Sequence, residues 1–319
     1  MKILITGGAG FIGSHLLDEL VKKGNEVWII DDLSTGRMEN IAHHEKNPKV
    51  HIIIDTIMNE KLMTRVISKV DQIYHLAAAV GVKYIIDNPL KSMEINIKGT
   101  EAVLALANKK KKKVLVASTS EIYGKNNNKL FREDDDRIMG STKIIRWSYA
   151  NAKALDEFFA FAYYREKQLP VVIVRLFNTC GPRQLGEYGM VIPRLIKQAL
   201  LNHPITVHGD GMQTRSFTYI TDVIYALIRL METEKAVGDV FNIGNPKGIT
   251  INELAKKIQK ATKSKSKIVK IPYEKAFEKG FEDMRYRVPD ISKLQSVINY
   301  KPKVDIDEML KKITEYFKS

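Results

Sequence analysis

A tyrosine and a lysine four residues apart could together carry out proton transfer. The stretch "YANAK" places Tyr149 and Lys153 on one face of an expected helix. A phenol is a poor base at neutral pH, but a neighbouring ammonium group and a bound cation both favour its phenolate form. Lowering the tyrosine pKa from ~10 to ~7 requires about 4 kcal/mol of differential stabilisation. We therefore predict that Tyr149 is a catalytic base supported by Lys153, although this spacing is common when taken alone.

Two further polar groups follow the apolar run "VLVA", in the stretch "STSEIYG" at residues 118–124. Thr119 falls at the expected carboxyl end of a strand, which is where ligands bind in open α/β sheets. Its hydroxyl can hold a substrate hydroxyl and orient the proton transfer. Glu121 can act as an acid or a base. The alternative for Glu121 is a carboxylate that only orders its loop.

A glycine-rich turn near the N-terminus predicts a dinucleotide site. The stretch "GGAGFIG" at residues 7–13 fits the G-x-G-x-x-G pattern between an expected strand and an expected helix. Glycines let the backbone approach a pyrophosphate, which the N–H groups of the helix N-terminus bind. Asp31 and Asp32 end the next strand, where an acid accepts a hydrogen bond from a ribose 2′-hydroxyl and repels a 2′-phosphate. We predict NAD rather than NADP. NADP stays an alternative because a nearby arginine, Arg37, could bind its 2′-phosphate.

These residues require a fold that brings strand ends together. Short β-branched runs end near residues 6, 31, 54, 76, 118 and 176 and alternate with helical patterns. The runs are apolar almost throughout, as expected for strands whose two faces are covered by helices. This order, with helices expected at 11–23, about 93–108 and about 149–167, predicts an α/β fold with a Rossmann-type, doubly wound parallel sheet. Asp55, just past the third run, is a candidate for the adenine edge or an ordinary loop acid.

The composition of the chain changes after about residue 178. Loops rich in glycine and proline alternate there with expected helices around 190–202 and 252–263. We predict an NAD-binding Rossmann domain at 1–178 and a smaller substrate-binding lobe at 179–319. Residues 212–245, which include the strand-like "DVFNIG", are expected to return partly to the first domain.

Composition argues against several other functions. The chain has 319 residues, a net charge of +14 and one cysteine, Cys180, so no internal disulfide and no thiolate metal site are predicted. Neighbouring His43 and His44 lack a metal-ligand pattern, and no metal site is predicted. The lysine run at 108–113 has no interleaved aromatic residues and is typical of a helix end, so we predict no nucleic-acid partner. The absence of a signal peptide and of any run of about 20 apolar residues predicts a cytoplasmic protein without a membrane partner.

Several stretches resemble one known family: "GGAGFIGSHL", "HLAA" at 75–78, "YANAK", "RLFNTCGPRQ" at 175–184 and "FNIGNP" at 241–246. Nearly end to end, the chain resembles the extended short-chain dehydrogenases/reductases, in the group of nucleotide-sugar epimerases, dehydratases and decarboxylases. The resemblance implies that NAD oxidises the sugar of a nucleotide-diphosphate sugar at C4. It implies that Tyr149 is the base and that Thr119 supplies an assisting hydroxyl. It also implies that Lys153 supports the base and contacts the nicotinamide ribose.

The resemblance also assigns binding residues. Asn178 resembles the family's substrate-contacting asparagine, and Arg215 resembles its diphosphate-binding arginine, a role that suits a guanidinium group. Tyr84 is expected either to contact the sugar or to pack. The expected cofactor contacts, besides Tyr149 and Lys153, are Gly7, Gly10, Phe11, Ile12, Gly13, Asp31, Asp32, Asp55, Leu76, Ala77, Ala78 and Asn96.

The resemblance leaves several reactions open, which share a 4-keto intermediate. An acid at Glu121 resembles GDP-mannose dehydratases and UDP-glucuronate decarboxylases, and Arg287 resembles the arginine that decarboxylases place beside the substrate carboxylate. A C4 ketone is β to the C6 carboxylate of a hexuronate, so CO₂ leaves readily. The loop at 77–84 lacks the Pro/Ser-rich sequence usual in decarboxylases. UDP-glucuronate decarboxylase is the preferred interpretation; the alternatives are a 4-epimerase, a 4,6-dehydratase and an NAD-binding scaffold without turnover.

The expected helix at 149–167 also predicts an assembly. It is apolar around most of its circumference, which is typical of a helix that is buried on several sides. In the family, this helix and the one near 93–108 form a four-helix dimer interface. We therefore predict a homodimer that binds a UDP-sugar.

Overall fold

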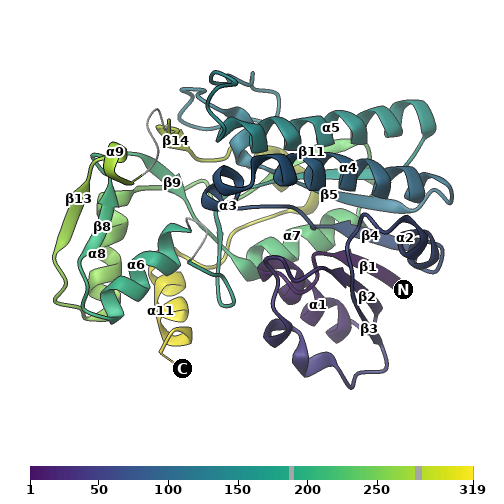
Figure 1. Cartoon of the computed structure of the whole chain (residues 1–319), viewed down its shortest axis with the longest axis horizontal. Coiled ribbons are helices and arrows are strands. Elements are labelled where there is room, and N and C mark those ends of the chain that lie inside the picture. Colours follow the sequence, from purple (N-terminus) through teal and green to yellow (C-terminus); the bar gives the residue numbers. More distant parts are fainter. Residues whose placement is uncertain (187–189, 277–281, 319) are drawn as a thin grey trace.

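The computed structural model describes residues 1–186, 190–276 and 282–318. Its centre is a seven-stranded sheet in the order β11-β6-β5-β4-β1-β2-β3 (Figure 1). The strands are β1 (Lys2–Thr6), β2 (Glu26–Asp31), β3 (Val50–Ile54), β4 (Gln72–His75), β5 (Lys113–Thr119), β6 (Val171–Leu176) and β11 (Asp239–Ile243). Every neighbouring pair is parallel, so all seven carboxyl ends lie along one edge. The predicted α/β class with a Rossmann-type parallel sheet is confirmed.

Helices cover both faces of this sheet, which explains why its strands are apolar throughout. One face packs against α1 (Phe11–Lys22), α7 (Ile220–Glu232) and α10 (Ser292–Ile298), and the other against α2 (Glu60–Ile67), α4 (Pro89–Asn108) and α5 (Trp147–Lys167). Successive residues of β1 alternate between the two layers: Ile5 belongs to the first and Leu4 to the second. Figure 1 shows α4 and α5 above the sheet and α1 and α7 below it.

The helix boundaries decide where the candidate site residues lie. Gly24 follows α1 with a φ of +85°, a conformation that suits glycine and ends the helix. Helix α4 begins earlier than expected, at Pro89, because proline is well tolerated in the first turn, where its missing N–H is not needed. Helix α5 also begins earlier, at Trp147, which places Tyr149 in its first turn.

The remaining elements form a smaller lobe beside the carboxyl edge of the sheet (Figure 1). It contains α6 (Val191–Leu200), α8 (Ile251–Thr262), α9 (Tyr273–Ala276), α11 (Ile306–Tyr316) and the strand pairs β8 (Ile205–His208) with β13 (Ile268–Ile271) and β7 (Thr179–Cys180) with β10 (Thr218–Tyr219). A three-stranded sheet joins β12 (Gly248–Thr250), β9 (Thr214–Ser216) and β14 (Tyr286–Arg287). In that sheet Arg287 pairs directly with Arg215, so two arginines far apart in sequence become neighbours.

Candidate active site

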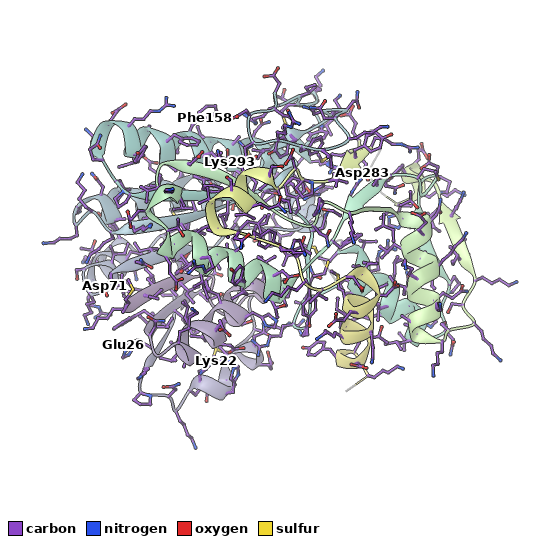
Figure 2. All side chains as sticks on the ribbon, turned by 180° about the vertical axis from the view of Figure 1, so that it is seen from behind. Lys22, Glu26, Asp71, Phe158, Asp283 and Lys293 are labelled. Carbon is purple, nitrogen blue, oxygen red and sulfur yellow. The ribbon has the colours of Figure 1, made fainter. Side chains whose placement is uncertain are left out.

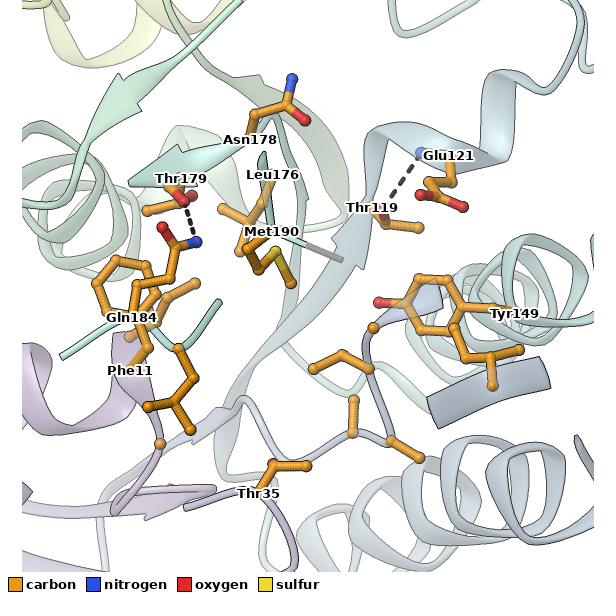
Figure 3. A pocket seen from close by; sticks show the side chains of 18 of the residues that line it. Phe11, Thr35, Thr119, Glu121, Tyr149, Leu176, Asn178, Thr179, Gln184 and Met190 are labelled. Carbon is orange, nitrogen blue, oxygen red and sulfur yellow. Dashed lines mark hydrogen bonds between the residues drawn. The ribbon is translucent and has the colours of Figure 1, made fainter. Parts of the chain in front are cut away.

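A cavity of about 880 Å³ lies between the carboxyl edge of the large sheet and the smaller lobe. The glycine turn lines one end of it, and Thr119 and Tyr149 line the other (Figure 3). Arg215 and Arg287 reach it from the smaller lobe. Its size is within the range of small-molecule and cofactor sites, about 300–1,000 Å³. The fold therefore gathers the predicted cofactor, catalytic and substrate residues around one space.

The glycine turn between β1 and α1 has no room for side chains. Gly7 has a φ of +75°, which favours glycine. A Cβ atom on Gly13 would lie 2.1 Å from the carbonyl oxygen of Gly7. The chain therefore enters α1 through a tight, bare turn that faces the cavity. This is the geometry that a pyrophosphate requires at a helix N-terminus.

Asp31 orders this turn as well as lining the cavity. Its carboxylate accepts hydrogen bonds from the backbone N–H groups of Ala9 and Leu33, both at 2.9 Å. Burial raises the pKa of Asp31, and these hydrogen bonds oppose the rise. Asp32 is exposed at the same strand end and also lines the cavity. Arg37 is not among the described residues that line it, so the acids at this strand end favour a free ribose hydroxyl, as in NAD.

The other predicted cofactor contacts divide into two groups. Those that line the cavity are Gly7, Gly10, Phe11, Ile12, Gly13, Asp55, Leu76, Ala77 and Ala78. Asn96 lies behind the wall instead: its side chain accepts from the N–H of Ala79 at 2.9 Å and donates to the Ala79 carbonyl at 3.2 Å. Asn96 therefore holds the loop that lines the cavity and is not itself among the described lining residues.

Tyr149 and Thr119 meet as the sequence predicts. Their side chains are hydrogen-bonded, and Thr119 Oγ1 also accepts from the N–H of Glu121 at 3.2 Å (Figure 3). Burial raises the pKa of Tyr149, and the negative charges of Glu121 and Asp156 add to the rise. The positive charge of Arg287 and the hydrogen bond with Thr119 oppose it. A phenolate at Tyr149 therefore depends on further positive charge, which a bound nicotinamide ring would bring.

The structure gives Lys153 a partner that the sequence did not predict. The sequence predicts an ammonium group that lowers the pKa of Tyr149. In the fold, the Lys153 ammonium lies 2.6 Å from the carboxylate of Asp156, and both side chains are buried. Lys153 is also not among the described residues that line the cavity. Its charge is compensated by a carboxylate on the same helix.

Glu121 and Arg287 form an ion pair that faces the cavity. Arg287 Nη1 lies 3.1 Å from Glu121 Oε1, and Arg287 Nε donates to Ser120 Oγ at 2.7 Å. Glu121 belongs to the short 3₁₀ helix η3 (Ser120–Tyr123) that follows β5, whereas Arg287 comes from β14. Burial lowers the pKa of Arg287, and the charge of Glu121 opposes this change. A carboxylate that could act as an acid or base is thus fixed beside a guanidinium group.

Two residues of this cluster were not predicted from the sequence. Arg146 lies one residue before α5, and its Nη1 is 3.3 Å from Asp283 Oδ1 while its Nη2 is 3.9 Å from Glu121 Oε2. Arg215 Nη2 contacts the same Asp283 oxygen at 2.8 Å. Burial alone would raise the pKa of Asp283, but Arg215 and Arg146 outweigh it and hold this pKa below its usual range. For Arg146, the sequence signal that could have indicated a place in the site is its position three residues before Tyr149.

The remaining predicted substrate residues lie in different places. Asn178 lines the cavity, and its amide donates to the Ser216 carbonyl at 2.7 Å, which ties the end of β6 to β9. Arg215 also lines the cavity. Tyr84 lies on α3 (Val82–Asp87), next to the cavity wall, but is not among the described lining residues. The sugar contact predicted for Tyr84 stays a prediction.

A second cluster of polar groups surrounds Asp18 of α1, and one of its members, Arg183, lines the cavity. His43 and His44 both contact Asp18 Oδ1, at 2.7 and 2.8 Å, a partner that their sequence neighbourhood does not reveal. Arg183 lies 2.8 Å from the other oxygen of Asp18. The carboxylate therefore already carries a cationic partner, and the cluster is explained as a hydrogen-bonded and ionic contact.

No helix in the described ranges is both long enough and apolar enough to cross a bilayer.

Comparison with known proteins agrees with this geometry. A family model described as GDP-mannose 4,6 dehydratase matches residues 4–313. The chain is 44% identical over 318 residues to UDP-N-acetyl-alpha-D-glucosaminuronate decarboxylase of Bacillus cytotoxicus, which covers 99% of this chain and 98% of that protein. It is 37% identical over 321 residues to UDP-glucuronic acid decarboxylase 1 of Arabidopsis thaliana, which covers 100% of this chain and 70% of that one.

Solved structures have the same fold from end to end. The crystal structure of UDP-glucuronic acid 4-epimerase from Bacillus cereus, in complex with UDP-glucuronic acid and NAD, is 32% identical with a TM-score of 0.89. The match covers 100% of this chain and 99% of that one. With the glycine turn, the acids at the end of β2 and the Thr119–Tyr149 pair around one cavity, the chain belongs to the NAD-dependent nucleotide-sugar epimerase and dehydratase family.

Proposed function

We propose that this protein is an NAD-dependent UDP-hexuronate decarboxylase. One observation carries the proposal: Arg146, Arg215 and Arg287 line the cavity together, beside the carboxylates of Glu121 and Asp283. Guanidinium groups at a cavity wall bind carboxylates well, so this cluster favours an anionic substrate group. The C6 carboxylate of a hexuronate is such an anion, and the Glu121–Arg287 pair lies beside the predicted base, Tyr149.

The residues of this chain have distinct tasks in the proposed reaction. The glycine turn and Asp31 would hold NAD, which takes a hydride from C4 of the sugar and later returns it. Tyr149 accepts the proton of the C4 hydroxyl, which Thr119 orients. The resulting ketone is β to the C6 carboxylate, so CO₂ leaves and its electron pair enters a C4–C5 enolate. Tyr149 finally returns its proton to the C4 oxygen.

Glu121 and Arg287 act at the other end of the sugar. Arg287, with Arg146 behind it, binds the C6 carboxylate before CO₂ is lost. In its protonated form Glu121 donates a proton to C5 of the enolate and then regains one from water. Arg287 thus holds the carboxylate that is lost, and Glu121 supplies the proton that replaces it.

Two UDP-hexuronates are candidate substrates. The relative at 44% identity is a decarboxylase of a UDP-N-acetyl-glucosaminuronate, and the relatives near 37% are UDP-glucuronic acid decarboxylases. We propose the 2-acetamido sugar as the preferred substrate and UDP-glucuronate as the second. The experiment offers each, and UDP-glucose, to the purified protein with NAD and resolves the products by NMR. A UDP-pentose or its 4-keto form from either uronate supports the proposal.

A 4-epimerase is the second candidate, because the Bacillus cereus structure of the same fold is a UDP-glucuronic acid 4-epimerase. It would use the same Thr119–Tyr149 pair and the same carboxylate contacts. A C4 epimer that keeps its C6 carboxylate would establish that candidate and overturn the decarboxylase. The variant Tyr149→Phe then separates both enzymes from an NAD-binding scaffold: it abolishes turnover in an enzyme and leaves NAD binding unchanged.

We also propose a homodimer formed by α4 and α5. These helices pack side by side, and Phe158 projects from the outer side of α5 with 63% of its surface exposed (Figure 2). Leu155 is exposed one turn earlier. Large apolar side chains in one exposed row favour burial by a second copy. A sedimentation mass of one chain at micromolar concentration would contradict the dimer; the cytoplasmic location and the exact division into domains stay predictions.

A further inference from the structure

The ion pair of Lys153 and Asp156 is buried inside α5, one turn after Tyr149. The two side chains are 3% and 0% exposed, and Lys153 Nζ lies 2.6 Å from Asp156 Oδ2. Removing two charges from water is costly, so such a pair persists only where its geometry is well supported. Neither residue is among the described residues that line the cavity. The charge of Asp156 nevertheless reaches Tyr149, where it adds to the rise in pKa that burial causes.

A chain of hydrogen bonds supports the carboxylate. Burial raises the pKa of Asp156, and the Lys153 ammonium together with a hydrogen bond from Thr100 of α4 opposes this rise. Thr100 Oγ1 is also 3.1 Å from His75 Nε2. His75 Nδ1 is 2.8 Å from Thr6 Oγ1. The same Thr6 hydroxyl accepts from the N–H of Ala77, which lines the cavity.

The donors and acceptors of this chain fit one assignment. Burial lowers the pKa of His75 to about 3, so its ring is neutral and donates from one nitrogen only. An ionised carboxylate only accepts, so Thr100 donates to Asp156 and its oxygen accepts from His75 Nε2–H. His75 Nδ1 then carries no proton and accepts from the Thr6 hydroxyl. In this chain of hydrogen bonds every donor points toward the Asp156 carboxylate on α5. The chain begins at the loop after β4 and passes through β1, β4 and α4.

We propose that Asp156 is a positioning residue that fixes the Lys153 ammonium and sets the pH range in which Tyr149 accepts a proton. Asp156 acts on Tyr149 through its own charge and through the position of Lys153, and it is not among the described residues that line the cavity. The inference rests on the proposed function only in assuming that Tyr149 oxidises a sugar at C4. It adds a carboxylate to the tyrosine–lysine pair, in a position where the sequence alone gave no signal.

The charges that face Tyr149 give the sign of the effect. Asp156 and Glu121 disfavour its phenolate, and Arg287 favours it. Glu157, next to Asp156, is neutralised by Arg175, which lies 2.7 Å away. Replacing Asp156 by asparagine removes one of the two negative charges that raise the pKa of Tyr149. The phenolate then forms at lower pH.

The experiment compares the pH dependence of kcat for the wild-type protein and Asp156→Asn. The acid limb of the profile is expected to move down by about one pH unit, for a single charge removed at moderate range. The substrate KM should be unchanged. Asp156→Glu, which restores the charge, should move the limb back. The matched control is Glu166→Gln, which removes an exposed charge from the same helix and should leave the profile unchanged.

Two results would overturn the inference: profiles of Asp156→Asn and Glu166→Gln that coincide with the wild-type profile, or a uniform loss of kcat without a shift. Asp156→Ser, which leaves room for a water molecule beside Lys153, repeats the test if the asparagine variant does not fold. The profile follows whichever sugar reaction the wild-type protein catalyses. Absence of CO₂ in the wild-type reaction would therefore count against the proposed function and not against Asp156.

Discussion

Arg287 and Glu121, separated by 166 residues in sequence, lie 3.1 Å apart at the wall of the cavity. Their pairing places a guanidinium group and a carboxylate on the side of the cavity where Tyr149 stands. A 4-epimerase of a neutral sugar requires neither group for its chemistry, whereas an enzyme that acts on a UDP-hexuronate can use both. This relationship therefore supports a uronate substrate, and the glycine turn and Tyr149 support the family.

Replacing Glu121 by glutamine should separate the two halves of the reaction. Glutamine keeps the size and one hydrogen-bond acceptor for Arg287 but cannot donate a proton to C5. Product formation should fall by about 10²–10⁴-fold, the usual contribution of a general acid or base. NAD affinity should stay at the wild-type value, because Glu121 lies at the other end of the cavity. Rates within a factor of two of the wild type would assign Glu121 a structural role.

Replacing Arg287 by lysine should weaken the recognition of the uronate selectively. Lysine keeps the charge but loses the forked geometry that binds a carboxylate and Ser120 together. A lost hydrogen bond between charged groups costs about 1.5–3 kcal/mol, which predicts a roughly 10–100-fold higher KM for a UDP-hexuronate. The affinity for UDP-glucose, which has no carboxylate, serves as the control. An equal loss for both ligands would mean that Arg287 contacts the diphosphate.

Replacing Gly13 by alanine should abolish NAD binding. The new methyl group would lie 2.1 Å from the Gly7 carbonyl oxygen, so the turn that approaches the pyrophosphate must open. Gly24→Ala is the matched control, because no atom lies within 4 Å of its Cβ position and only its φ of +85° is strained. Titration with NAD should show binding to the control and not to Gly13→Ala. Normal binding to both variants would exclude this turn as the cofactor site.

Replacing Arg175 by methionine should destabilise the protein without touching the cavity. Arg175 binds Glu157 through two hydrogen bonds of 3.0 and 2.7 Å, and both residues are buried. Leaving one buried charge unpaired costs about 3–5 kcal/mol, which denaturant unfolding would measure. The double variant Arg175→Met with Glu157→Gln should recover part of that loss, since no charge is then left unpaired. A double variant less stable than the single one would contradict this account of the pair.

The sequence was sufficient for the sheet, the cofactor turn and the pairing of Thr119 with Tyr149. Strands covered on both faces are apolar throughout, and their carboxyl ends must share one edge once the order of elements is known. Glycine at positions 7, 10 and 13 has a local steric cause. Thr119 and Tyr149 meet because one ends a strand and the other starts the next helix, so local patterns suffice to place them.

The sequence was not sufficient for contacts that depend on tertiary packing. Arg146 and Asp283 are 137 residues apart, and neither has a local pattern that indicates an ion pair. Asp156 lies on a helix that is apolar around most of its circumference, so periodicity did not reveal that its carboxylate is buried beside Lys153. Asn96 was predicted to contact the cofactor, and the fold places it behind the loop that lines the cavity, where it bonds Ala79. These positions are fixed by which elements pack together.

The most direct test of the central claim follows carbon C6 of the sugar. The purified protein with NAD is incubated with a UDP-hexuronate labelled with ¹³C at C6, as the 2-acetamido sugar and as the glucuronate, and the label is followed by NMR. The account predicts that the label leaves the sugar and appears as bicarbonate, in wild-type protein and not in Tyr149→Phe. A label that stays at C6 while the sugar changes configuration at C4 would contradict it.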